Sequence, residues 1–162
     1  MTALPGSGQD GPVSEVAVVW VDDLETEVCW TLVANAPIGR LAFVDDGAPR
    51  IFPVNHRVDG HSVVFRTEGD SPFAPLLDGR LLAFEVDGAD PAAETGWSVL
   101  VTGRLERVTG DLDRLAALDV HPWAPGGNDT FVRLVPASVS GRAISRRRRP
   151  GGGDLEPYSP TA

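Results

Sequence analysis

The segment from Arg66 to Ser71 carries side chains that could bind a phosphate group. Arg66 and Thr67 end an apolar run, and Ser71 follows before a stretch with helical character. A guanidinium forms paired, charge-assisted hydrogen bonds with phosphate oxygens, while hydroxyls and helix-start amides add neutral donors. All 14 basic residues are arginine, so any phosphate bound here is held by arginine or by neutral donors. The alternative is that Arg66 and Thr67 have only a structural role, because Arg and Thr are common at strand ends.

The segment from Pro53 to His56 could face a flat heterocycle. Pro53 lies within an apolar run, where its missing N–H favours a strand edge or bulge whose backbone groups are free for a ligand. Asn55 and His56 follow it and could present polar groups to such a ring. His56 is the best candidate for a catalytic, titrating group. The alternative for His56 is a solvent-facing position on a strand.

Aromatic residues could wall the same ring, since Phe52, Trp97 and Trp123 flank these segments, although buried aromatics more often belong to the core. No phosphate-binding loop, dinucleotide fingerprint, esterase elbow or paired-cysteine motif occurs in the sequence. Cys29 is the only cysteine and lies in an apolar setting, so we interpret it as an inert, buried thiol. One cysteine and three scattered histidines are too few to predict a zinc site.

Composition excludes several classes of function. The formal net charge is −9, and an acidic body is repelled by nucleic acid and by anionic membranes. The longest apolar run, residues 16–21, is far shorter than the roughly 20 residues of a membrane-spanning helix. The first fifteen residues contain no basic residue and no apolar stretch, so we expect no signal peptide and a cytoplasmic protein.

Periodicity and turn residues predict the elements between two disordered ends, residues 1–15 and 146–162. The four arginines 146–149 could bind RNA or an acidic partner, but a solvated tail is the simpler interpretation. A helix is predicted from Asp22 or Asp23, as its cap, to Ala36. Predicted strands follow at 38–44, 49–58, 62–67, 81–86, 97–108, 130–135 and 139–144, with a short helix or loop at 71–77 and a helix at 112–118.

About seven closely spaced strands with few helices predict a mostly β protein, a Greek-key or meander barrel that forms a single domain over residues 16–145. Long helices do not alternate with the strands, which disfavours a parallel α/β fold. No internal repeat and no second domain is visible.

Several of these segments occur in an order that carries a resemblance. The ordered run GRLAF, IFPVNHRVDG, VVFRT, FEVDG, GWSVLVTGRLERV, PW and GRAI resembles the pyridoxamine 5′-phosphate oxidase-like, FMN-binding split-barrel family. It is most similar to the branch of short proteins that includes nitroimidazole-resistance-type reductases. The match covers about residues 22–145.

The resemblance implies a six-stranded Greek-key split barrel that forms a homodimer, with two FMN sites at the subunit interface. It implies a flavin-dependent oxidoreductase acting on a small molecule, in which the flavin carries the redox chemistry. The implied cofactor-binding residues are Arg66, Thr67 and Ser71 at the phosphate, Pro53, Val54, Asn55 and His56 along the isoalloxazine edge, Trp97 and Ser98 from the other subunit, and Trp123 over the ring.

One departure bears on the cofactor. Members of this branch commonly carry a lysine after the Arg-Thr pair, in a pattern like RT-x-x-G-[ST]-K, whereas Pro72 stands at that position here and Glu68 and Asp70 flank the loop. Losing one charged hydrogen bond costs on the order of 1.5–3 kcal/mol. Two alternatives therefore stay open, namely a deazaflavin cofactor in the same fold and a non-catalytic binding protein that has lost FMN. Pyridoxamine-phosphate oxidation itself is disfavoured, because outside the arginine-rich tail no second basic cluster is seen for a substrate phosphate.

Overall fold

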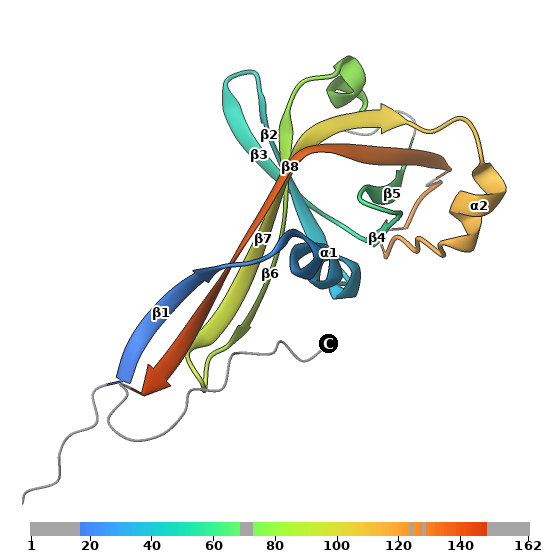
Figure 1. The fold of residues 1–162 in the computed structure, drawn as a ribbon. Helices are drawn as coiled ribbons and strands as arrows, with labels where there is room; N and C mark the ends of the chain where they lie inside the picture. The colour runs from blue at the N-terminus through green and yellow to red at the C-terminus, as the bar shows by residue number, and fades with distance from the viewer. Residues whose placement is uncertain (1–16, 69–72, 124, 128, 149–162) are drawn as a thin grey trace, which may run out of the picture.

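The computed structural model describes residues 17–68, 73–123, 125–127 and 129–148. Within these ranges, antiparallel strands form one sheet in the order β3-β2-β6-β7-β8-β5-β4, with β1 pairing to β8 (Figure 1). The strands are β1 Ala17–Asp23, β2 Gly39–Asp45, β3 Ala48–Val54, β4 His56–Val58, β5 Val63–Thr67, β6 Leu82–Asp90, β7 Thr95–Arg107 and β8 Thr130–Arg148. The predicted mostly β architecture is confirmed.

The two ends of the sheet are consecutive in the chain. β3 pairs with β2 and β4 pairs with β5, yet only Asn55 separates β3 from β4. The prediction of one strand over 49–58 was wrong, because the chain leaves one end of the sheet at Asn55 and joins the other. The sheet thus curls into a barrel whose hydrogen-bonded path stays open between β3 and β4.

The hairpin from β2 to β3 turns where the sequence predicts it. Asp46 and Gly47 have positive φ values of 47° and 76°, the conformation of a tight two-residue hairpin turn, and Asp45 pairs with Ala48 on either side. By contrast, the two strands predicted at the C-terminal end are one strand, β8. Pro136 interrupts the pattern, and the ladder accommodates it with a register shift opposite Thr102 and Gly103.

Long stretches of β6, β7, β8 and β1 run together into an arm that projects from the rest of the molecule (Figure 1). β1 pairs with the last part of β8 over Ala17–Asp23. Neither β1 nor the strand character of residues 146–148 was predicted; the arginines there looked like a tail, but cross-strand pairing extends β8 to Arg148.

Helix α1 (Thr26–Asn35) lies against the inner side of the sheet. It begins later than predicted, because Asp22 and Asp23 are still in β1 and make no cap. The close approach of α1 to β8 needs Gly141, where a Cβ atom would lie 2.7 Å from Cys29 Sγ. Cys29 is fully buried, as expected. The main core forms between α1 and the sheet, and Leu41, Phe65, Phe84, Val101 and Leu134 are among its buried members.

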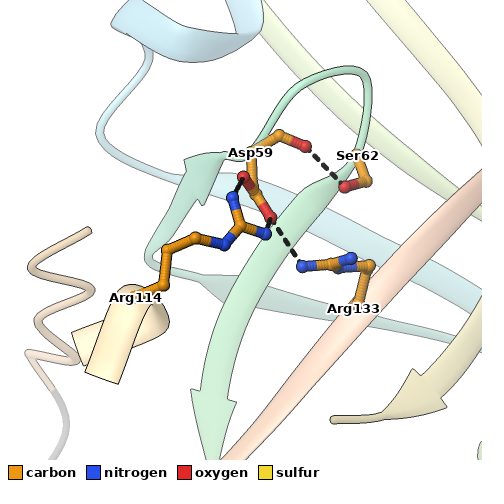
Figure 2. Close-up of polar contacts among 4 residues, drawn as sticks. All are labelled: Asp59, Ser62, Arg114 and Arg133. Atoms are coloured by element: carbon orange, nitrogen blue, oxygen red, sulfur yellow. Dashed lines mark hydrogen bonds and ion pairs between the residues drawn. The ribbon is translucent and has the colours of Figure 1, made fainter. Parts of the chain in front are cut away.

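Two shorter elements complete the described chain, the 3-10 turn η1 (Ala74–Asp78) and helix α2 (Leu112–Ala117). Leu115 of α2 and Val120 pack with Val64 in a second, smaller cluster. Asp59, in the turn between β4 and β5, accepts hydrogen bonds from Arg114 of α2 and from Arg133 of β8 (Figure 2). In the parts of the chain described, no helix has the length and apolar character needed to cross a membrane.

Candidate functional site

A cavity of about 450 Å³ opens between the end of α1 and the strands β2, β6 and β7. Its volume falls in the range of small-molecule sites, about 300–1,000 Å³. It is mostly apolar, with a few polar groups. The lining residues are Val28, Thr31, Leu32, Asn35, Ala36, Pro37, Ile38, Arg40, Asp87 and Trp97.

Of the predicted site residues that the structure describes, Trp97 alone lines this cavity. It lies near the start of β7, directly opposite Gly88 of β6. A Cβ atom on Gly88 would lie 2.7 Å from the indole Nε1, so the glycine leaves the room in which the ring packs against the strand. Ser98, the next residue, is exposed and points to the opposite face of β7. Ser98 is not among the described residues that line the cavity.

Arg40 and Asp87 are the charged lining residues of the cavity, and Glu85, outside the lining, is a second carboxylate in contact with Arg40; these three side chains are called the rim below. Arg40 Nη1 donates to Asp87 Oδ1 at 2.6 Å and to Glu85 Oε2 at 3.1 Å. The hydrogen bond and charge of Asp87, followed by those of Glu85, raise the pKa of Arg40. One guanidinium thus faces two carboxylates, which leaves this rim with a net charge of about −1. Sequence reasoning missed all three residues.

Asn55 uses both ends of its side-chain amide on the protein's own backbone. Its Nδ2 donates to the carbonyl of Pro37 at 3.1 Å, and its Oδ1 accepts from the N–H of Trp123 at 2.9 Å. Asn55 thus links Pro37 to the loop that follows α2. Its amide is not free for a flavin edge, but it places the exposed Trp123 next to the segment that lines the cavity.

His56 lies inside the molecule, and the alternative of a solvent-facing strand position is wrong because its side chain is 1 % exposed. The imidazole Nε2 is 2.8 Å from the carbonyl of Val33, which requires the neutral ring to donate from Nε2. Burial lowers the pKa of His56, against the opposing effect of the Val33 carbonyl. The ring does not line the cavity, and its predicted catalytic role stays a prediction.

Arg66 at the end of β5 is a cation without an ion-pair partner among the described residues. Its guanidinium carbon lies 5.2 Å from the centre of the Phe131 ring, and its Nε is buried without a hydrogen bond. Thr67 is buried on the other face of the strand. A group that contacts both side chains must therefore lie beyond the end of β5.

The remaining predicted site residues are Pro53 and Val54 in β3, and Ser71, which lies outside the described residues. Pro53 is exposed at the edge strand β3 and pairs with Arg40, in agreement with the predicted edge position. Val54 is half-buried and packs against the core. Ser71 and Pro72, and with them the acidic Asp70, fall outside the described residues. Within one chain, Trp97 and Pro37 line the cavity and Asn55 links Pro37 to Trp123, while Arg66 and Thr67 lie at the end of β5.

Comparison with known proteins places the chain in a family. Residues 25–143 match the family described as pyridoxamine 5′-phosphate oxidase. The chain is 34% identical over 154 residues to the uncharacterized protein Rv0080 of Mycobacterium tuberculosis, which covers 90% of this chain and 99% of that protein.

Solved structures agree in fold. A FAD binding protein from Mycobacterium smegmatis is 27% identical and has a TM-score of 0.61, covering 76% of this chain and 98% of its own. A putative 5-nitroimidazole antibiotic resistance protein from Bacteroides thetaiotaomicron has a TM-score of 0.63 at 10% identity, covering 88% of this chain and 99% of its own, which is a likeness of fold alone. The chain therefore belongs to the pyridoxamine 5′-phosphate oxidase-like, flavin-binding split-barrel family.

Proposed function

We propose that this protein is an oxidoreductase that binds FMN between two copies of the chain and acts on a small molecule. The observation that carries the proposal is Arg66. In an acidic chain, this half-buried arginine has no carboxylate partner among the described residues, and its Nε lies out of water without a hydrogen bond. Such a guanidinium is suited to an anionic group, and a phosphate supplies the acceptors it lacks.

The other residues of the proposed site bind and orient. When bound, the flavin supplies the hydride or electron chemistry. Trp97 walls the cavity with its indole face, and Asn55 holds Trp123 in place through the backbone. No described acidic or basic side chain is placed to act as an obvious proton donor inside the cavity, since Arg40 and Asp87 are paired with each other at its rim.

A homodimer is part of this proposal because one chain separates the two groups of predicted residues. Arg66 is not among the residues that line the cavity beside Trp97. A second copy packed against the exposed strands would bring the cavity beside Trp97 of one chain toward the Arg66 of the other, so that the phosphate ligand of the flavin and the cavity border one site.

Two observations favour a cofactor other than FMN, or no flavin at all, in the proposed site. The 27% identical FAD binding protein of Mycobacterium smegmatis supports FAD as the flavin. The acidic, exposed Glu68 directly after Thr67, together with Pro72 in place of the lysine, supports a deazaflavin or a binding protein without a flavin. FAD, a deazaflavin and a ligand that is not a flavin differ in the phosphate contacts that each needs from the protein.

The test is an absorbance titration of the purified full chain with FMN, FAD and a deazaflavin. We expect saturable FMN binding with shifted visible bands, and Arg66→Ala should weaken it by at least about tenfold. Arg50→Ala is the matched control, because Arg50 is exposed on β3 at the far end of the sheet path. Equal affinities for the Arg66 variant and the parent would remove Arg66 from the site, and no uptake of any flavin would leave only the binding-protein alternative.

A further inference from the structure

The cavity beside Trp97 has a charge pattern that restricts its ligand. Its body is apolar, formed by one face of α1 and by the segment that follows it. Five side chains supply this surface beside the indole of Trp97, namely Val28, Leu32, Ala36, Pro37 and Ile38. A surface of this kind accepts a flat, largely apolar ring system.

The polar groups inside the cavity are few and unequal. Thr31 Oγ1 donates to the carbonyl of Glu27 at 2.9 Å, so its proton is already used within α1. The side-chain amide of Asn35 makes no hydrogen bond within the described residues, and it is free to donate and to accept. A ligand with one neutral polar substituent, such as a carboxamide, matches that amide.

The rim opposes anions. Among the described lining residues Arg40 is the only cation, and Asp87 in the lining together with the adjacent Glu85 overcompensates its charge. The three side chains are half-exposed and lie on neighbouring strands, with Arg40 of β2 directly opposite Glu85 of β6. An anionic ligand entering here meets a net negative rim on a chain of net charge −9, which repels it.

We propose that this cavity is the substrate site and that the Arg40–Glu85–Asp87 rim selects uncharged or cationic heteroaromatic or aromatic compounds against anionic ones. The inference rests on the proposed function, since it names the class of small molecule on which the oxidoreductase acts. Asp87 is the specificity-determining residue, because it makes the shorter of the two contacts to Arg40. Phosphorylated or carboxylated substrates are excluded.

Three probes of one shape and different charge test the proposal, namely 2-naphthamide, 2-naphthoate and 2-naphthylmethylammonium. The readout is the indole N–H signal of Trp97 in NMR spectra of the full chain without flavin, identified by its loss in Trp97→Phe. We expect the neutral and cationic probes to shift this signal and 2-naphthoate to bind at least about tenfold more weakly. Equal affinity for naphthoate and naphthamide, or no shift with any probe, would overturn the proposal.

Asp87→Asn provides the matched variant. It removes one carboxylate from the half-exposed rim with little change in volume, and the preference for naphthamide over naphthoate should shrink several-fold. Asp113→Asn, an exposed change of the same kind on α2, should leave the preference unchanged; an equal effect of both variants would contradict a role for the rim.

Addition of FMN tests whether the substrate or the flavin ring occupies the cavity beside Trp97. If saturating FMN leaves naphthamide bound beside Trp97, the cavity is the substrate site; if FMN displaces it competitively, the substrate assignment is wrong. Probe binding without any flavin uptake would sink the proposed function while leaving the cavity's selectivity intact. Flavin uptake with no probe binding would overturn the substrate-site proposal and leave the proposed function intact.

Discussion

At the scale of single residues, the imidazole of His56 is the most completely buried polar side chain in the described part of the molecule. It donates from Nε2 to the Val33 carbonyl of α1 and packs edge-on against Phe84, with ring centres 4.9 Å apart. A proton added to this ring would place a charge in the core without a carboxylate to pair with. The ring therefore joins β4 to α1 as a neutral group.

This environment predicts a pH dependence of stability. Burial lowers the pKa of folded His56 below its unfolded value of about 6.5. As the pH falls below about 6.5, the unfolded chain binds the proton first, so stability present above that pH is lost as the pH approaches the folded pKa, by up to about 1.4 kcal/mol per pH unit. Urea unfolding at pH 7.5 and 5.5 measures the loss, which should be about 1 kcal/mol smaller in His56→Gln.

His121→Gln serves as the control, because His121 is exposed and should keep the parent's pH dependence. If His56→Gln and the parent lose the same free energy of unfolding between the two pH values, the folded pKa of His56 is not lowered.

Some site residues were accessible from the sequence, and others depend on contacts that no local pattern reveals. Trp97 follows from an aromatic residue at the start of a long strand, and it does line the cavity. Arg40 meets Glu85 only because β2 pairs with β6, 45 residues away in the chain. The spacing of Glu85 and Asp87 places them on one face only once β6 is known to run to Asp90, because the predicted strand 81–86 ends before Asp87. The residue opposite them could not be named without the strand order.

At the scale of elements, one carboxylate fastens three segments. Asp59 receives two hydrogen bonds from Arg114 of α2, at 2.7 and 2.8 Å, and one from Arg133 of β8 at 2.5 Å (Figure 2). Its backbone also closes the turn with Ser62, whose Oγ donates to the Asp59 carbonyl at 2.7 Å. The side chain of Asp59 is only 10% exposed, whereas that of Arg114 is 55% exposed and that of Arg133 26%, so the contact to Arg133 is the better protected from water.

We expect Asp59→Asn to destabilise the protein by about 1.5–3 kcal/mol, because a neutral amide cannot replace an acceptor of charge-assisted hydrogen bonds from two arginines. Chemical denaturation measures the change, and limited proteolysis within residues 109–120 reports whether α2 has loosened. Asp119→Asn, an exposed position just after α2, controls for charge and should change stability by less than about 0.5 kcal/mol. Equal stability of the two variants would show that the Asp59 contacts do not hold α2.

Most element types were predictable, whereas the way they join was not. Alternation and turn residues identified β2, β5, β6, β7 and α2 within a few residues of their observed bounds. The run 49–58 reads as one strand because its side chains give no sign of the change of partner at Asn55. Likewise, the arginines at the end of β8 carry no strand pattern, and only pairing with β1 makes them extended.

At the scale of the whole molecule, one face of the arm carries exposed apolar side chains that nothing in a single chain covers. Leu100 of β7 and Ile144 of β8 point to the same face, as does Val21 of β1, the cross-strand partner of Ile144. These side chains are 43%, 45% and 61% exposed, respectively. The row between Leu100 and Ile144 on this face holds Ser98 and Arg142, so the face mixes apolar and polar side chains as many protein interfaces do, and a second copy of the chain is the occupant that the proposed site requires.

This face predicts how the dimer can be broken. Leu100→Asp places a charge in the centre of the proposed interface, which should weaken self-association by at least about tenfold, or about 1.4 kcal/mol. Sedimentation velocity of the full chain over a range of concentrations measures this, with Leu112→Asp as the control, because Leu112 is 50% exposed on α2, away from the arm. The same Leu100 variant should lose FMN affinity in parallel, since the proposed site needs both chains. A monomeric parent protein would refute the shared site, and a dimer weakened equally by both variants would place the interface elsewhere.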